Sequence, residues 1–303
     1  MMMRVSGWIA GLGGLTVAVA APLAARDAGE PGFIADVPEE ALDELPGPTI
    51  FDGDFMTIGA GVGLVPSYSG SDDYVLFPLP LIQGSIGGID LDPRPAGLAV
   101  DFLPDSAEGP NFSLGVVARL NRDRVNRIED EVVEAYGELD TAVEVGPTAG
   151  VSFPKLLNPF DSLSFNVDVA WDVLGAHNGM TISPSVSYFT PLSRAAAISL
   201  SVSTEYIDDD YARYYYSVPA ADPLAAGQVL PAFDAEGGFE DIGVNLLVGY
   251  DLSGDVTDGG LALVGIGGYS RLLGDAKNTP FTSLRGDADQ WIVAVGIGYT
   301  FGL

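Results

Sequence analysis

The segment Trp291-Ile-Val-Ala-Val-Gly-Ile-Gly-Tyr-Thr-Phe301, close to the end of the chain, alternates between two kinds of residue. Every second position, beginning with Trp291, is large and apolar, and the positions between them are mostly small or polar. Successive side chains of a β-strand point to opposite faces, so this period of two predicts a strand with one apolar face. At roughly ten residues, the segment is as long as a tilted strand that crosses a membrane.

The same alternation recurs along the chain from about residue 55 onward. In residues 163–173 the odd positions are apolar, and in residues 242–252 the even positions are. The pattern predicts eleven strands, over residues 55–66, 74–89, 94–103, 111–121, 138–153, 159–174, 178–190, 194–207, 239–253, 258–272 and 288–302.

Single-chain bacterial barrels have an even number of strands, so this set contains one error. Residues 74–103 include Pro78, Pro80 and several glycines, which could hide an additional turn. Residues 211–218 could instead form a strand outside the membrane. We predict an all-β, antiparallel up-and-down transmembrane β-barrel of twelve strands, with ten strands as the alternative.

A soluble β-sandwich also alternates, so the choice of a membrane barrel rests on further features. The predicted strands are long, and Tyr188, Tyr206, Tyr250, Tyr269 and Trp291 fall near strand ends, as interfacial aromatic girdles do. Lys and Arg are almost absent from the apolar faces, where a charge at the membrane midplane costs about 2–4 kcal/mol.

Composition excludes several classes of protein. The formal charge of −29, from 42 acidic against 13 basic residues, argues against nucleic-acid binding, which needs a basic surface. The chain has no cysteine, so neither disulfides nor thiolate metal sites can form. An apolar content of 47% is too high for a disordered acidic tail.

The first residues have the features of an export signal. Arg4 precedes an apolar run over residues 8–20, and small alanines follow before Arg26. We predict a cleavable signal peptide at residues 1–25, a periplasmic linker at 26–54 and an outer-membrane barrel at 55–303. A signal anchor is the alternative, but the apolar run is short for a spanning helix. The linker is rich in proline and acidic residues: Asp36, Glu39, Glu40, Asp43 and Glu44.

Acidic residues on the polar faces of the strands are candidates for the barrel interior. They are Asp140, Glu144, Asp168, Asp172, Glu205 and Asp251. Carboxylate rings favour cations in channels, so an open lumen lined by these residues would prefer cations. The alternative is an interior filled by side chains, with the acids paired to Arg119 or solvated.

His177, the single histidine of the chain, lies at a predicted external turn. A histidine beside a carboxylate or a serine can act as a general base, but we favour a structural histidine that hydrogen-bonds the loop backbone. Asp72-Asp73 and residues 208–210 could bind divalent cations, yet they lack the ligand spacing of a dedicated site. We therefore predict no enzyme activity, no cofactor and no metal site.

Several short motifs together resemble the MltA-interacting protein family, also called MipA/OmpV. They are Tyr68-Ser-Gly70-Ser71-Asp72-Asp73-Tyr74 with Pro78-Leu-Pro80, Gly175-Ala-His177-Asn-Gly179, Asp208-Asp-Asp-Tyr211 with Tyr214-Tyr-Tyr-Ser-Val218, Gly237-Gly238, and Tyr269-Ser-Arg-Leu-Leu-Gly274-Asp275-Ala276 with Asn278-Thr-Pro280. The resemblance covers about residues 55–302. The chain departs from a common barrel ending, because it continues for two residues beyond Phe301.

The resemblance implies a structural role at the outer membrane. The name-giving member is thought to link a murein transglycosylase to a peptidoglycan synthase, so it implies a scaffold with these periplasmic enzymes as partners and membrane lipid around the barrel. Other members are discussed as porin-like or adhesive. A small cation-preferring channel or a surface adhesin therefore remains the alternative function.

Overall fold

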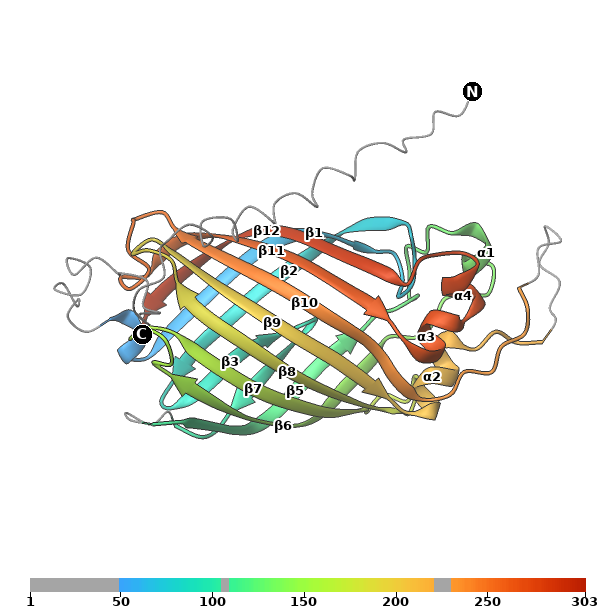
Figure 1. The fold of residues 1–303 in the computed structure, drawn as a ribbon, viewed down its shortest axis with the longest axis horizontal. Coiled ribbons are helices and arrows are strands. Elements are labelled where there is room, and N and C mark those ends of the chain that lie inside the picture. The colour runs from blue at the N-terminus through green and yellow to red at the C-terminus, as the bar shows by residue number, and fades with distance from the viewer. Residues whose placement is uncertain (1–48, 105–108, 221–229) are drawn as a thin grey trace, which may run out of the picture. The chain divides into compact units, whose positions relative to one another are not determined.

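The computed structural model describes residues 49–104, 109–220 and 230–303, so the predicted signal peptide and residues 26–48 of the predicted linker lie outside the described residues. A short 3-10 helix, η4 (Ile50–Asp52), precedes the first strand. The strands are β1 (Phe55–Pro66), β2 (Tyr74–Ile86), β3 (Ile89–Arg94), β4 (Gly97–Asp101), β5 (Asn111–Asn121), β6 (Ala142–Pro154), β7 (Ser162–Asp172), β8 (Met180–Pro191), β9 (Ala196–Ile207), β10 (Gly238–Asp251), β11 (Gly260–Leu272) and β12 (Asp289–Gly302). Each pairs with its neighbour in the chain, and β1 pairs with β12 to close the barrel (Figure 1).

The structure confirms the twelve-stranded antiparallel barrel and shows where the missing strand lies. Residues 89–101 form a short hairpin of β3 and β4, where the sequence pattern predicted one strand over residues 94–103. Gly87 and Gly88, with φ angles of 61° and 80°, make the turn between β2 and β3.

The other candidate for the additional strand, residues 211–218 as a strand outside the membrane, is wrong, because these residues do not form a strand. Most of them belong to the helix α2 (Asp209–Tyr216). Asp208 is its N-cap, and its side chain accepts a hydrogen bond from the backbone N–H of Tyr211.

The outward faces of the strands are apolar, as the alternation predicts. On β12, the side chains of Trp291, Val293 and Val295 are 56%, 58% and 63% exposed. The same holds for β7 with Phe165 and Val167. A wall of exposed apolar side chains is stable only against an apolar solvent, so these faces fit the hydrocarbon of a membrane. Among the described residues, no helix has both the length and the apolar character needed to cross a membrane.

The two ends of the barrel differ in their connections. At one end, which we call the turn end, the strands are joined mainly by short segments, and the C-terminus lies there. At the other end, longer connections carry α1 (Glu131–Glu134), α2, α3 (Gly274–Asn278) and α4 (Pro280–Ser283) (Figure 1). We call the described residues of the segments 67–73, 122–141, 173–179, 208–237 and 273–288 the cap.

The cap is packed rather than loose, and its side chains form two apolar clusters. One cluster gathers around α2, and its buried members are Ile207, Tyr211, Ala212, Tyr215, Tyr216, Ala235, Leu272 and Ala276. The other joins four cap segments through Tyr68, Ile128, Val132, Val133, Val218, Leu230 and Phe281. Residues distant in sequence therefore close over one mouth of the barrel.

Candidate functional site: a polar network under the cap

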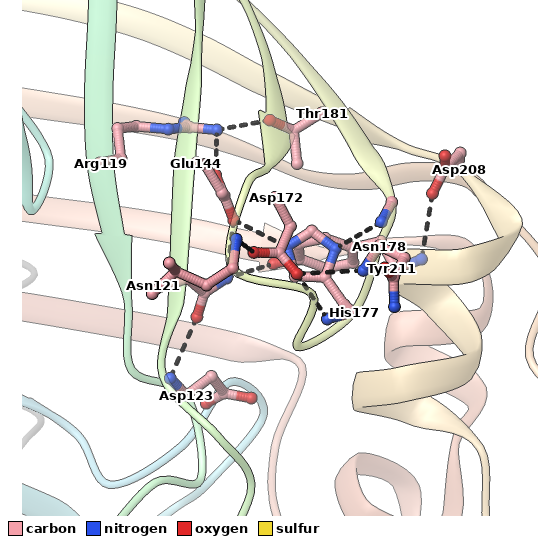
Figure 2. A network of polar contacts seen from close by, with 12 residues as sticks. Arg119, Asn121, Asp123, Glu144, Asp172, His177, Asn178, Thr181, Asp208 and Tyr211 are labelled. Carbon is pink, nitrogen blue, oxygen red and sulfur yellow. Dashed lines mark hydrogen bonds and ion pairs between the residues drawn. The ribbon is translucent and has the colours of Figure 1, made fainter.

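Arg119 on β5 is the centre of a polar network inside the barrel. Its Nη2 donates to Glu144 Oε2 (2.8 Å), Glu205 Oε1 (3.1 Å) and Thr181 Oγ1 (2.6 Å), and its Nη1 donates to Ser183 Oγ (3.1 Å). These partners lie on β6, β8 and β9, so one guanidinium connects four strands. Figure 2 shows Arg119 with Glu144 and Thr181 at the edge of the network that leads toward the cap.

His177 continues the network into the cap. Its Nδ1 accepts the backbone N–H of Gly179 (3.0 Å), so the ring proton belongs on Nε2, which lies 3.4 Å from Glu144 Oε1. The ring contacts Tyr211 edge-on with centroids 4.9 Å apart, and the side chain is 0% exposed. A general base must reach its substrate, and this imidazole is enclosed by its own loop, α2 and Glu144.

Asp172, at the end of β7, holds the loop that carries His177. Its carboxylate accepts the backbone N–H groups of Leu174 (3.0 Å), His177 (2.9 Å) and Asn178 (3.1 Å), as Figure 2 shows for the last two. A carboxylate that collects several N–H groups fixes a turn without needing a cation. Asp172 therefore folds a cap segment rather than lining an open lumen.

Helix α2 of the cap is anchored to the network by hydrogen bonds of its tyrosines. Asn121 Nδ2 donates to the hydroxyl of Tyr211 (3.0 Å), and the hydroxyls of Tyr211 and Tyr216 donate to Glu240 Oε1. Burial, reinforced by the nearby Glu240 carboxylate, raises the pKa of both tyrosines well above the ordinary value. Both hydroxyls therefore stay protonated and act as donors at physiological pH.

Glu240 is a site residue that the alternation pattern missed. In β10 the even positions face outward, so strict alternation places Glu240 on the membrane side. The pairing of β10 with β9 shifts register between Phe239 and Asp241, and this bulge turns Glu240 to the buried interior. The charged pair Glu240-Asp241 in an otherwise alternating segment was the available signal.

The predicted interior acids fall into three groups. Glu144 and Glu205 pair with Arg119, and Asp168 pairs with Arg94 Nε (3.0 Å) and accepts from Thr148 Oγ1 (2.5 Å). The barrel interior therefore contains cross-linked charges rather than a ring of free carboxylates.

The remaining three acids lie at the barrel ends. Asp172 lies at the cap end of β7, where it holds the loop of His177. Asp251 accepts N–H groups of the β10–β11 turn, including that of Ser253 (2.7 Å). The interior placement of Asp140 is wrong, because β6 begins only at Ala142 and Asp140 is exposed in the cap, where its N–H donates to Tyr214 Oη (2.9 Å).

The motif residues that resemble the family belong mostly to the cap. Tyr68 is buried and donates to the carbonyl of Phe281 (3.3 Å). Gly70 has a φ of +93°, and a Cβ there would overlap Thr282 Oγ1. Ser71 is buried beside Ser67, whereas Asp72 and Asp73 are exposed. Tyr74 Oη accepts the Trp291 N–H, and Pro78 and Pro80 lie on β2. Gly175 has a positive φ, Gly179 packs against Asp208, Gly274 starts α3, and Asp275 accepts the Glu236 N–H.

The network holds the cap to the barrel by charge-assisted hydrogen bonds. Within the described ranges, no group of three or more histidine, aspartate or glutamate side chains could hold an ion. Asp208, one of the acidic residues considered for cation binding, is used as the N-cap of α2.

A closed barrel with apolar outer faces, a polar interior and one capped mouth defines a membrane-spanning β-barrel protein. The chain belongs to the family described as MltA-interacting protein MipA, whose family model matches residues 58–301. This confirms the resemblance seen in the sequence motifs. No curated protein is significantly similar in sequence.

Solved outer-membrane structures are similar to the chain only in outline. An outer membrane channel from Pseudomonas putida F1 is 12% identical with a TM-score of 0.43, covering 90% of this chain and 100% of that one. The KdgM porin is 11% identical with a TM-score of 0.35, covering 81% and 99%. The Ralstonia pickettii toluene transporter TbuX is 10% identical with a TM-score of 0.37, covering 90% and 96%.

Proposed function

We propose that this protein is a non-enzymatic outer-membrane scaffold for peptidoglycan-remodelling enzymes, with its cap outside the cell and its turn end in the periplasm. Barrels of the outer membrane have long extracellular loops and short periplasmic turns, which supports this orientation. The family description names an interaction with MltA, which supports a murein transglycosylase as one partner. A peptidoglycan synthase is the second partner of the proposal.

The main structural support is a rigid apolar turn at the turn end. Asp161 accepts the backbone N–H groups of Leu156 (2.7 Å) and Leu157 (2.9 Å), and it accepts the Tyr188 hydroxyl (2.6 Å). This turn displays Leu157, which is 77% exposed, beside Phe160. A preformed apolar turn loses little conformational entropy on binding a partner, so it favours protein contact.

The acidic linker is a second candidate contact of the same proposal. Residues 26–48 include five carboxylates between Asp36 and Glu44, which could pair with a basic face of a cell-wall enzyme. Such a contact would weaken with salt, whereas contact through Leu157 would not. A passive spacer is the alternative for this segment.

Photo-crosslinking in intact cells tests the scaffold. A benzophenone amino acid at Leu157 should capture a transglycosylase or a synthase, identified by mass spectrometry. The matched control is the same probe at Leu284, an exposed leucine (58%) in the cap, which should capture neither. Adducts with lipid alone at Leu157, with no enzyme recovered, would contradict the scaffold.

Removal of residues 27–48 separates the two contacts. Loss of the Leu157 adducts in the shortened chain would assign recruitment to the linker, and their persistence would assign it to the turn. An undiminished yield in high salt would argue against the acidic linker in either case.

The interior charge supports a cation-preferring channel as the second candidate function. The guanidiniums of Arg94 and Arg119 are outnumbered by the carboxylates of Glu144, Asp168 and Glu205, with which they pair. Any ion path would therefore favour cations. The packed cap opposes free conduction, so conductance in planar bilayers separates the two functions.

A further inference from the structure

The barrel wall contains a seam between β2 and β3 that is paired at only one end. β2 pairs with β1 from Tyr74 to Ser85, but only Gly84, Ser85 and Ile86 pair with β3. β3 and β4 then form a hairpin that turns back at residues 95–96. In the described part of the chain, no ladder joins residues 74–83 to any strand on this side. The edge of β2 is therefore unpaired on this side from Tyr74, at the cap, to Gln83.

The two prolines of β2 fit this open edge. The carbonyl of Leu76 accepts a hydrogen bond from Arg127 Nη1 (2.8 Å), which comes from the loop beyond β5. Backbone groups of alternate residues in a strand point to the same side, so those of Pro78 and Pro80 also point into the seam. Their missing N–H groups therefore remove no bond to β1. They also deprive the seam of donors, so another strand could not complete a ladder there.

The inner face of β2 beside the seam is apolar. Phe77, Leu79 and Leu81 alternate with outward residues and are partly buried in the barrel. Glycines of the neighbouring strands lie against these side chains. A Cβ added to Gly63 would lie 3.0 Å from Cδ1 of Leu79. A Cβ added to Gly298 would lie 3.5 Å from Cδ2 of Leu81. The unpaired edge of β2 thus lies between the membrane side of the wall and an apolar strip inside the barrel.

Arg127 places a positive charge at the cap-side rim of the seam. Arg127 has a φ of +57°, which is uncommon for a residue other than glycine, and its side chain is exposed. In the described ranges, its hydrogen bond goes to the neutral Leu76 carbonyl, and it forms no ion pair. Its remaining donors are placed for an anionic group.

We propose that the seam binds a single-chain anionic amphiphile, of which a long-chain fatty acid is the simplest form. The alkyl chain enters through the gap beside Pro78 and Pro80 and packs on Phe77, Leu79 and Leu81. The carboxylate meets Arg127 at the rim. Paired strands lie roughly 4.8 Å apart, and an alkyl chain is of similar width, so it suits a length of wall where the ladder is absent. This inference goes beyond the proposed scaffold and shares with it only the placement in a membrane.

Photoaffinity labelling of the full chain in lipid nanodiscs tests the site. Palmitic acid with a diazirine at its methyl end should label residues 77–83, and unmodified palmitic acid should compete. Arg127→Gln should reduce this labelling severalfold. Arg213→Gln is the control, because Arg213 is an exposed cap arginine already paired with Asp210, and it should leave labelling unchanged.

Three outcomes of this experiment would overturn the proposal. The first is labelling spread evenly over the outward faces of the strands. The second is labelling that Arg127→Gln does not change. The third is equal labelling of residues 77–83 by a phosphatidylglycerol with the diazirine in one acyl chain, which would assign the seam to ordinary bilayer lipid.

Engineered cysteines test the opening independently of any ligand, since the chain has none of its own. Ile86→Cys with Ile89→Cys joins two outward residues that face each other in the β2–β3 ladder, and it should oxidise readily to a disulfide. Ile82→Cys with Pro93→Cys occupies the positions that would face each other if the ladder continued toward the cap. This second pair should stay reduced, and a disulfide formed as readily as in the first pair would overturn the opening.

Discussion

Gly70 shows how a single motif residue determines the cap. Its φ of +93° is accessible to glycine, and a methyl group there would overlap Thr282 Oγ1. Thr282 cannot easily move away, because its hydroxyl donates to the carbonyl of Ala276 (2.7 Å). The motif glycine is therefore required by two separate constraints, one of backbone and one of packing.

We expect Gly70→Ala to destabilise the folded barrel by roughly 1–3 kcal/mol, read from the temperature at which heat-modifiable migration on a gel is lost. Gly254→Ala is the matched control, since Gly254 has a φ of +95° in a turn-end connection with no atom near its would-be Cβ. The control should lose only the stability that the strained backbone costs, so its destabilisation should be smaller. Equal losses in both variants would contradict the packing contact with Thr282.

His177 has a structural role in the network. Replacement by alanine removes the acceptor of the Gly179 N–H and the ring against Tyr211. We expect His177→Ala to destabilise α2 locally by about 1–3 kcal/mol, measured as faster hydrogen exchange in residues 209–216. Lipase and protease assays should be unaffected, and a specific loss of either activity would reopen a catalytic reading of this histidine.

Among the helices, α1 is stabilised by the carboxylate of Asp130. Asp130 caps the helix by accepting the N–H groups of Val132 and Val133 (2.9 Å each), and it pairs with Arg285 Nη2 (2.6 Å). Burial alone would raise the pKa of Asp130. The hydrogen bonds from Arg285 and the helix outweigh burial and lower its pKa below the ordinary value.

A lowered folded-state pKa gives the cap an acid sensitivity. The contribution of Asp130 to stability is complete above the unfolded pKa of about 3.9 and is lost as the pH falls toward the lower folded value. We therefore expect hydrogen exchange in α1, corrected for the intrinsic pH effect, to speed up as the pH falls below about 4.

Two substitutions of Asp130 separate its charge from its cap. Asparagine also caps helices, so Asp130→Asn should keep most of α1 and lose this acid sensitivity. Asp130→Ala should additionally cost about 1 kcal/mol at neutral pH. An unchanged acid response in Asp130→Asn would show that another group controls the cap.

At the scale of the whole molecule, we expect the cap to control whether the barrel conducts ions. In planar bilayers the intact protein should show small conductance or none, because the mouth is packed. Replacing residues 210–236 by two glycines should raise the conductance and reveal cation preference, since interior carboxylates outnumber the paired arginines. The deletion is feasible because Gly237 N–H donates to Asp209 (2.8 Å), so its ends are adjacent.

Leu157→Asp, a change at the turn end, should leave the conductance as it is and serves as the control. Large stable channels in the intact protein would favour transport over the scaffold. Anion preference in the shortened chain would contradict the account of the interior.

The sequence alone determined that the chain forms a barrel and which residues of its strands face inward or outward. Period two is a local property of the backbone, so the outward faces of β7, β10 and β12 could be read before any contact was known. Interior placement of Glu144, Asp168 and Glu205 followed from the same parity. The motifs also identified the family, and the structure places most of their residues in the cap, where Gly70 and Gly175 have positive φ angles.

Only the tertiary structure decided which side chains meet and where the alternation fails. The helix α2 was missed because Tyr214-Tyr-Tyr favours a strand in isolation, and burial of Tyr211, Tyr215 and Tyr216 against other cap segments outweighs that preference. Glu240 faces inward because of a bulge, and the β2 seam exists because the β3–β4 hairpin is short. The helix α2, the inward Glu240 and the β2 seam each depend on pairing between segments distant in sequence. A local sequence pattern does not predict the free energy of such pairing.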